Sequence, residues 1–360
     1  MTTETIDVPY VPLAAQPAGV PWPTEAWPAG DVPAGVDVDG LVDELFADPD
    51  GPFGRTFAAL MVHRGRLLAE RYSGEIEHWD GPNETVGPTT GLLSWSMAKS
   101  MLHATVGSLV ADGRIDPEVP AGVPDWQAPD DPRRQITLQD LLEMRDGLDF
   151  AESYELGSTS DVIEMLFGTG QDDTAGYATA KSLAAPPGER YSYSSGSSNV
   201  ISSIVARIVG PGVSYRRYLQ ERIFGPIGMA SARPTFDEAG TWVASSYVHA
   251  TARDYARFGY WYLRDGVWAG ERLLPEGWVD HGRAPRSVDA EHGYFYGSHW
   301  WATGDEHGTF RASGYEGQSL LVSPGLDLVV VRLGKTPDDL GPNLEGWRRR
   351  VVAAFAAADS

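Results

Sequence analysis

The chain contains no cysteine in its 360 residues, which excludes a disulfide framework, a thiol nucleophile and a thiolate metal site. It has no apolar run long enough to cross a bilayer as a helix. HExxH and GxSxG motifs are also missing, so neither a zinc-protease helix nor a nucleophile elbow is expected. We therefore expect an activity that needs no cofactor and no metal ion.

Positive charge is scarce as well, because 28 lysines and arginines face 50 acidic residues and the net charge is −22. Such a field repels phosphate backbones and anionic lipid surfaces. We expect no nucleic-acid partner and no membrane association, which leaves a small molecule as the expected partner. The segment 1–7 has neither the basic nor the apolar region of a signal peptide, so the expected location is cytoplasmic. The oligomeric state has no signature in the sequence and stays unknown.

Lysine is rare in this chain: Lys99, Lys181 and Lys335 are the three lysines, and the other residues of the Lys+Arg total are arginines. Arginine keeps its proton in proteins, whereas lysine can lose it and act as a base. Lys99 follows Ser96 by three residues in an apolar stretch that predicts a buried helix over 96–112. Residues three apart share one helical face, so the pattern predicts a serine activated by a neutral lysine. The alternative is an ordinary buried helix start with a surface lysine.

Strand patterns occur at both ends of the chain, and helical patterns fill the middle. A proline-rich arm over 1–40 precedes a hairpin predicted at 57–72. Helices are predicted at 36–47, 96–112, 138–145, 160–167, 197–209, 215–223, 251–265 and 345–358, and strands at 294–302, 310–312, 318–322 and 326–333. The pattern favours an α/β (α+β) fold in which both chain ends build one antiparallel sheet, flanked by helices, around an inserted helical subdomain.

This organisation predicts three parts. They are an N-terminal arm with the first helix (1–52), a sheet-containing subdomain (53–95 with 236–360) and a mainly helical subdomain (96–235), with the active site at the junction of the last two.

Two further motifs accompany the serine and lysine. The segment Tyr193-Ser194-Ser195 follows a Pro-Gly turn and precedes a predicted helix, and loops of this kind often carry functional side chains. The segment 312–318 (ASGYEGQ) lies at the end of a predicted strand, where glycines allow close backbone approach and expose N–H donors. Taken singly, a tyrosine packed in a polar turn and a plain β-turn are the competing interpretations.

In this order, the three motifs resemble those of the serine hydrolases with the penicillin-recognising (β-lactamase/transpeptidase-like) fold. This group includes class C β-lactamases, D-alanyl-D-alanine carboxypeptidases, related carboxylesterases and 6-aminohexanoate-dimer hydrolases. The likeness extends over most of residues 55–355. The Tyr-Ser-Ser form and the GxxGQ form at 314–318 look closest to the dimer-hydrolase and esterase branch.

The resemblance implies a catalytic role for four residues. Ser96 is the implied nucleophile. Lys99 either accepts its proton or holds Tyr193 as a tyrosinate that does so, and the sequence leaves this choice open. Tyr193 is also implied to pass the proton to the leaving group. The backbone N–H groups of Ser96 and Tyr315 are implied to form the oxyanion hole.

The same resemblance implies substrate contacts from Ser195, Ser313 and Gly314, and it has two departures. β-Lactamases usually carry asparagine where Ser195 stands and lysine where Ala312 stands, and that lysine helps to hold the antibiotic carboxylate. Arg311 is a poor substitute, because neighbouring strand residues point to opposite faces. Both departures favour an ester or a linear amide over a β-lactam.

We therefore expect a serine hydrolase that works through an acyl-enzyme. A β-lactamase or D-Ala-D-Ala carboxypeptidase is the alternative within enzymes, and a catalytically idle binding protein on the same fold is the alternative outside them. The main hypothesis needs the lysine pKa to fall by roughly 3 units to give a mostly neutral amine at pH 7. Burial and a nearby positive helix end both act in that direction.

Overall fold

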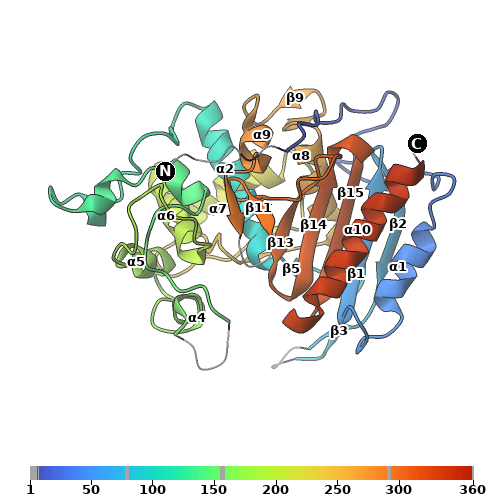
Figure 1. Cartoon of the computed structure of the whole chain (residues 1–360), viewed down its shortest axis with the longest axis horizontal. Helices are drawn as coiled ribbons and strands as arrows, with labels where there is room; N and C mark the ends of the chain where they lie inside the picture. The colour runs from blue at the N-terminus through green and yellow to red at the C-terminus, as the bar shows by residue number, and fades with distance from the viewer. Residues whose placement is uncertain (1–5, 7, 78–80, 155–158, 290–292, 359–360) are drawn as a thin grey trace.

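In the computed structural model, residues 6, 8–77, 81–154, 159–289 and 293–358 are described. An eight-stranded sheet in the order β10-β11-β12-β13-β14-β15-β1-β2 dominates one half of the molecule (Figure 1). Every adjacent pair in it is antiparallel. The strands are β1 (Arg55–His63), β2 (Arg66–Tyr72), β10 (Ser287–Asp289), β11 (Tyr294–Tyr296), β12 (Trp301–Ala302), β13 (Phe310–Gly314), β14 (Gln318–Ser323) and β15 (Leu328–Lys335).

Helices fill the segment between the two groups of sheet strands and also flank the sheet (Figure 1). They are α1 (Val38–Phe46), α2 (Ala98–Ala111), α3 (Leu138–Leu142), α4 (Asp161–Phe167), α5 (Thr174–Thr179), α6 (Ser195–Val209), α7 (Val213–Leu219), α8 (Ala252–Leu263), α9 (Trp278–Arg283) and α10 (Gly341–Ala358). Short strands pair outside the main sheet: β3 (Glu75–Ile76) with β4 (Glu84–Thr85), β7 (Val248–Ala250) with both β5 (Leu92–Leu93) and β6 (Arg233–Pro234), and β8 (Val267–Trp268) with β9 (Glu271–Arg272). No helix of the described part is long and apolar enough to traverse a lipid bilayer.

The predicted sheet from both chain ends is confirmed, because β1 pairs with β15 along its whole length. Alternate strand residues point to opposite faces, and each face carries its own core. Ala59 and Met61 of β1 pack with α1 and α10, whereas Leu60 and Val62 pack on the side of α8. Helices therefore cover both faces, which explains why these strands read as continuous apolar runs. The predicted subdomain boundaries stay a prediction.

Two predicted elements end differently from what the patterns indicated. The helix predicted over 138–145 ends at Leu142, because Met144 has a left-handed backbone (φ 58°) that a helix cannot continue through. The single strand predicted over 294–302 is wrong: β11 and β12 are separate strands joined by a turn. At Gly297 a Cβ atom would lie 2.1 Å from a carbonyl oxygen, and His299 has φ 61°. The aromatic run of this segment conceals the turn.

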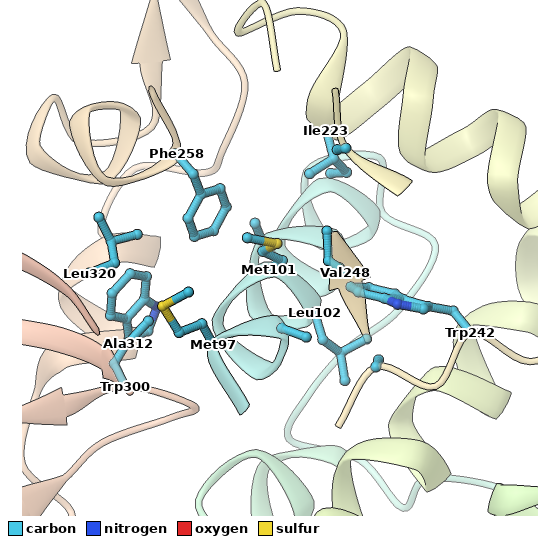
Figure 2. Packing of buried hydrophobic residues seen from close by; sticks show 14 of the residues in the cluster. Met97, Met101, Leu102, Ile223, Trp242, Val248, Phe258, Trp300, Ala312 and Leu320 are labelled. Carbon is cyan, nitrogen blue, oxygen red and sulfur yellow. The ribbon is translucent and has the colours of Figure 1, made fainter. Parts of the chain in front are cut away.

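The apolar helix predicted after Ser96 is present as a 3-10 turn, η1 (Trp95–Met97), followed by α2. Figure 2 shows its Met97, Met101 and Leu102 in the centre of the core. Sheet and α8 side chains lie on one side of the helix, and Ile223, Trp242 and Val248 lie on the other side (Figure 2). Because α2 is buried from Ala98 to Leu109, it joins the two parts of the molecule, and its first turn lies at their junction.

In its described part, the proline-rich arm has no helix before α1, and it is fixed along α8. Arg257 Nε donates to the carbonyl oxygen of Pro23 at 2.7 Å, and Arg264 Nη1 donates to that of Ala14 at 3.0 Å. Two buried arginines, one in α8 and one directly after its end, thus satisfy carbonyl groups that a segment without regular structure would otherwise leave unpaired.

Candidate active site

Ser96 lies at a strained point of the backbone. Trp95 has φ 44°, a left-handed conformation that bulky residues rarely adopt and that concentrates at functional sites. The preceding Ser94 fixes the segment, because its Oγ donates to the carbonyl of Ser246 at 3.0 Å and accepts from the N–H of Val248 at 3.0 Å. The turn leaves Trp95 and Ser96 partly exposed, whereas Ser94 and Met97 are buried.

The side chain of Lys99 is buried, with 2% of its surface exposed. Its Nζ lies 3.0 Å from Ser96 Oγ, 3.1 Å from Ser195 Oγ and 2.9 Å from the carbonyl oxygen of Ser245. Burial lowers the pKa of Lys99 to about 8, although the Glu152 carboxylate acts in the opposite direction. The predicted juxtaposition of hydroxyl and amine is present, with an amine that can lose its proton near neutral pH.

Tyr193 is the third group that the structure brings to this point. The Lys99 Nζ lies 4.9 Å from the centroid of the Tyr193 ring, which stacks on Trp301 at 5.5 Å between centroids. Burial raises the pKa of Tyr193, the Glu152 carboxylate raises it further, and a hydrogen bond with the Ser96 side chain lowers it. The net direction is upward, so the phenol is neutral at neutral pH.

Ser195 is the first residue of α6 and is fully buried. Its Oγ donates to Glu152 Oε1 at 2.7 Å and its N–H donates to Glu152 Oε2 at 2.8 Å, while the same Oγ faces Lys99. The hydroxyl is thus enclosed between an amine and a carboxylate. The predicted substrate contact from Ser195 stays a prediction, and this geometry does not favour it.

Glu152 is the residue of this centre that the sequence did not reveal. It lies in the loop before α4, outside every motif described above, and is partly buried. A single acid in a loop has no periodic or spacing signal, so only its partners identify it. Its carboxylate also accepts from Tyr154 Oη at 2.9 Å.

Gly314 explains how the sheet reaches the nucleophile. A Cβ atom at this position would lie 2.4 Å from the carbonyl oxygen of Ser94, so only glycine lets the end of β13 approach η1 this closely. Tyr315 follows directly, and its ring meets that of Trp95 edge to face at 5.7 Å. The N–H groups of Ser96 and Tyr315 lie at the starts of short helical turns, where no acceptor within the turn can use them.

The turn that carries Tyr315 is braced from behind. Gln318 Nε2 donates to the carbonyl oxygens of Tyr315 at 3.1 Å and Gly334 at 2.6 Å, and its Oε1 accepts from the N–H of Gly334 at 2.9 Å. The buried Arg332 donates to the carbonyl of Glu316 at 3.2 Å. The Gly-Gln motif therefore stabilises the position of the Tyr315 N–H.

The remaining strand residues present no cation to the site. Ser313 Oγ accepts from Arg311 Nε at 3.0 Å, and Arg311 is itself buried and paired with Glu345 Oε2 of α10 at 2.5 Å. Ala312 points into the core beside α2 (Figure 2). Arg311 is therefore engaged on the opposite face, in agreement with the prediction that it cannot replace the missing lysine.

Aromatic and acidic groups surround the exposed side of the centre. Tyr315, with 38% of its surface exposed, stacks on Tyr154 at 5.0 Å between ring centroids. Burial raises the pKa of Tyr315, and the nearby carboxylates of Asp338 and Glu316 raise it further. Within the described residues, no group of three or more histidine or acidic side chains could hold a metal ion. The electrostatic surroundings favour neutral or cationic molecules over anionic ones.

Comparison with known proteins gives a consistent result. The Beta-lactamase family model matches residues 53–355. A 6-aminohexanoate-dimer hydrolase from Paenarthrobacter ureafaciens is 30% identical over 313 residues, which cover 81% of this chain and 75% of that protein.

Solved structures share the fold. A candidate 6-aminohexanoate-dimer hydrolase from Bacillus anthracis superposes with a TM-score of 0.73 at 24% identity, covering 92% of this chain and 88% of its own. A penicillin-binding protein homologue from Caulobacter crescentus superposes with a TM-score of 0.66 at 16% identity, and the match covers 85% of this chain and 94% of that chain. A family VIII carboxylesterase superposes with a TM-score of 0.64 at 14% identity, and the match covers 86% of this chain and 96% of that chain.

Proposed function

The chain belongs to the beta-lactamase family, and from this premise we propose that it hydrolyses a carboxylic ester or a linear amide through an acyl-enzyme formed on Ser96. The family membership and the β-lactamase/transpeptidase-like fold confirm the resemblance stated from the sequence. One observation carries the proposal: the buried Lys99 amine lies 3.0 Å from the Ser96 hydroxyl.

Acylation begins with the transfer of the Ser96 proton. We assign the base to Lys99, because its pKa of about 8 leaves a usable neutral fraction, whereas burial raises the pKa of Tyr193 and disfavours a tyrosinate. The freed Oγ bonds to the substrate carbonyl carbon, and the carbonyl oxygen becomes negative. The N–H groups of Ser96 and Tyr315 stabilise this charge, which exists only at the tetrahedral stage.

Collapse of the tetrahedral intermediate breaks the bond to the leaving alcohol or amine. The leaving atom takes a proton from the Tyr193 phenol, and the protonated Lys99 restores that proton. Water then attacks the acyl ester of Ser96, with the same groups acting in reverse. Lys99 and Tyr193 thus form a relay whose net proton change over the cycle is zero.

The substrate class follows from what the site lacks. Ala312 offers no cation, and Arg311 is held by Glu345, so a substrate carboxylate has no anchor at this strand. Glu316 and Asp338 act near Tyr315 and repel anions. A linear amide or ester without an anchored carboxylate therefore fits better than a β-lactam. The Paenarthrobacter relative is named as the hydrolase of a 6-aminohexanoate dimer, and two amino acids joined amine to carboxylate form a linear amide.

A β-lactamase or D-Ala-D-Ala carboxypeptidase is the second candidate. It is favoured by the family match over 53–355 and by the penicillin-binding fold neighbour. The two candidates can be distinguished by comparing the rates at which the protein hydrolyses nitrocefin, a β-lactam, and p-nitrophenyl butyrate, an ester. The main proposal expects faster turnover of the ester, and faster turnover of nitrocefin would replace it with the second candidate.

Covalent labelling distinguishes the proposed enzyme from a catalytically idle binding protein on the same fold. We expect a fluorophosphonate probe to label the folded protein at Ser96, with the adduct located by peptide mass spectrometry. Ser96→Ala is the matched control and should remain unlabelled. A folded wild-type protein that neither reacts with the probe nor hydrolyses the ester would reject the enzymatic proposal.

A further inference from the structure

Glu152 and Lys99 face each other across one hydroxyl group. The Ser195 Oγ lies 2.7 Å from the Glu152 carboxylate and 3.1 Å from the Lys99 Nζ. Anion and amine are therefore within about 6 Å of each other, a separation at which the anion favours the protonated amine. They are nevertheless not in direct contact, since Ser195 lies between them.

The groups that face Lys99 from each neighbouring element can be named. They are the Ser96 hydroxyl of η1, the Ser195 hydroxyl of α6, the Ser245 carbonyl before β7, the Tyr193 ring, and His299 between β11 and β12. Burial lowers the pKa of His299 to about 3 and raises that of Tyr193, so both are neutral near pH 7. Within the described part of the chain, Glu152 is thus the charge that acts on the amine.

The position of Glu152 is itself fixed. Its second oxygen accepts the N–H of Ser195 at 2.8 Å, in the first turn of α6, where the helix dipole stabilises an anion. These bonds fix the carboxylate in place, and it raises the pKa of Lys99 from that fixed position.

We propose that Glu152 is the positioning residue of the proton relay: its carboxylate fixes the Ser195 hydroxyl beside Lys99 and, as the facing anion, sets the pH above which this amine accepts the Ser96 proton. This inference rests on the proposed hydrolase function for its catalytic meaning. The electrostatic part can be measured without turnover.

The main variant is Glu152→Gln. An amide can accept the Ser195 N–H through its oxygen and donate to the Ser195 hydroxyl through its nitrogen, so the geometry can persist while the charge is removed. Glu152→Asp keeps the charge but retracts it from Ser195. Glu143→Gln is the matched control, because Glu143 is also a partly buried glutamate and pairs with Gln139 and Arg286 instead.

The readout uses the scarcity of lysine. The full chain labelled with 13C at the lysine ε carbons has three signals, from Lys99, Lys181 and Lys335, and Lys181→Arg and Lys335→Arg assign them. We expect Glu152→Gln to lower the pKa of Lys99 by roughly one unit, with Glu143→Gln leaving it unchanged. The acid limb of kcat/KM for p-nitrophenyl butyrate should move to lower pH by the same amount.

The outcomes separate the two proposals. An unmoved Lys99 pKa in folded Glu152→Gln, with an active and probe-labelled wild type, overturns the role of Glu152 and leaves the hydrolase intact. A lowered pKa in a chain whose wild type neither labels nor turns over overturns the hydrolase and leaves the electrostatic coupling.

If the glutamine variant does not fold, Glu152→Asp carries the test. The retained charge predicts a Lys99 pKa within about half a unit of wild type, together with a reduced kcat, because Ser195 is held less well. A drop of a full unit, or an unchanged kcat, contradicts the proposal.

Discussion

Two lysines of this chain occupy similar surroundings and have opposite protonation behaviour. The Lys99 Nζ lies 4.9 Å from the Tyr193 ring centroid, and the Lys181 Nζ lies 4.4 Å from that of Tyr177. Both amines also have an acidic side chain nearby. Two differences remain: Lys99 is buried whereas Lys181 is partly exposed, and Lys181 contacts Asp161 directly whereas Lys99 meets only hydroxyl and carbonyl oxygens.

The pKa values follow from that difference. Desolvation lowers the pKa of Lys181, but its hydrogen bonds with Asp161 and Tyr177 more than compensate, and the net shift is upward. Desolvation also lowers the pKa of Lys99, and the more distant Glu152 offsets it only in part, leaving about 8. The deeper burial of Lys99, together with the hydroxyl between it and Glu152, therefore separates a candidate base from the ion pair of Lys181.

The sharpest test of this contrast replaces each lysine with arginine, which keeps the charge but cannot deprotonate. We expect Lys99→Arg to lower the acylation rate by at least ~10²-fold, the low end for a positioned base. Lys181→Arg should leave it unchanged. Stopped-flow release of p-nitrophenol measures both, and near-wild-type acylation by Lys99→Arg would refute the base assignment.

The tyrosine beneath each lysine gives the second test. Tyr193→Phe removes the proposed proton donor to the leaving group and should slow turnover by about 10²-fold. Tyr177→Phe removes a hydroxyl bonded to Asp161 and should leave kcat unchanged. Equal kinetics in the two phenylalanine variants would remove Tyr193 from the mechanism.

The third test is the pH dependence of the reaction. In the proposed mechanism the neutral form of Lys99 is the active one, so kcat/KM for a neutral ester should fall about tenfold for each pH unit below about 8 and level off above it. Lys181 stays protonated throughout this range, because its pKa is raised. A flat profile between pH 6 and 8, a range of about two units, would contradict the assignment.

The two lysines should also affect stability with opposite signs. The folded-state pKa of Lys99 lies below its ordinary value of 10.5, so the unfolded chain binds more protons between pH 8 and 10.5 and the unfolding free energy rises with pH there. We expect this contribution to be on the order of 3 kcal/mol, from the fall of the pKa from 10.5 to about 8. Lys181, whose pKa is raised, contributes stability that is lost as pH rises through its folded-state pKa. Urea unfolding of wild type and Lys99→Met across this range measures the Lys99 slope.

The smallest effect is expected at the ion pair. Asp161→Asn should lower the unfolding free energy by about 1–2 kcal/mol, since it weakens the bonds to Lys181, Tyr177 and the Ala151 N–H. It should not change kcat. A loss of activity comparable with that of Lys99→Arg would mean that the two lysine sites are coupled, contrary to the comparison above.

The sequence predicted much of the fold and the core of the site, for local reasons. A helix starting near Ser96 brings residues 96 and 99 together whatever surrounds it, and strand patterns at both chain ends predicted one antiparallel sheet. The predicted strand 294–302 failed because the turn between β11 and β12 is imposed by a distant carbonyl, that of Gly282, against Gly297. The sequence predicted that the backbone approaches another group closely near Gly314. It did not predict that this group belongs to Ser94, which lies 220 residues away in the chain.

By itself, the sequence determined the serine–lysine pair, the family resemblance and the absence of a cationic anchor at Ala312, since these depend on residue identity and short spacing. Only the tertiary structure decided that Ser195 is enclosed, that Glu152 faces Lys99, and that Lys181 is an ion pair. Burial and charge at a given atom are set by segments far apart in the chain, and they fix whether an ammonium group keeps its proton.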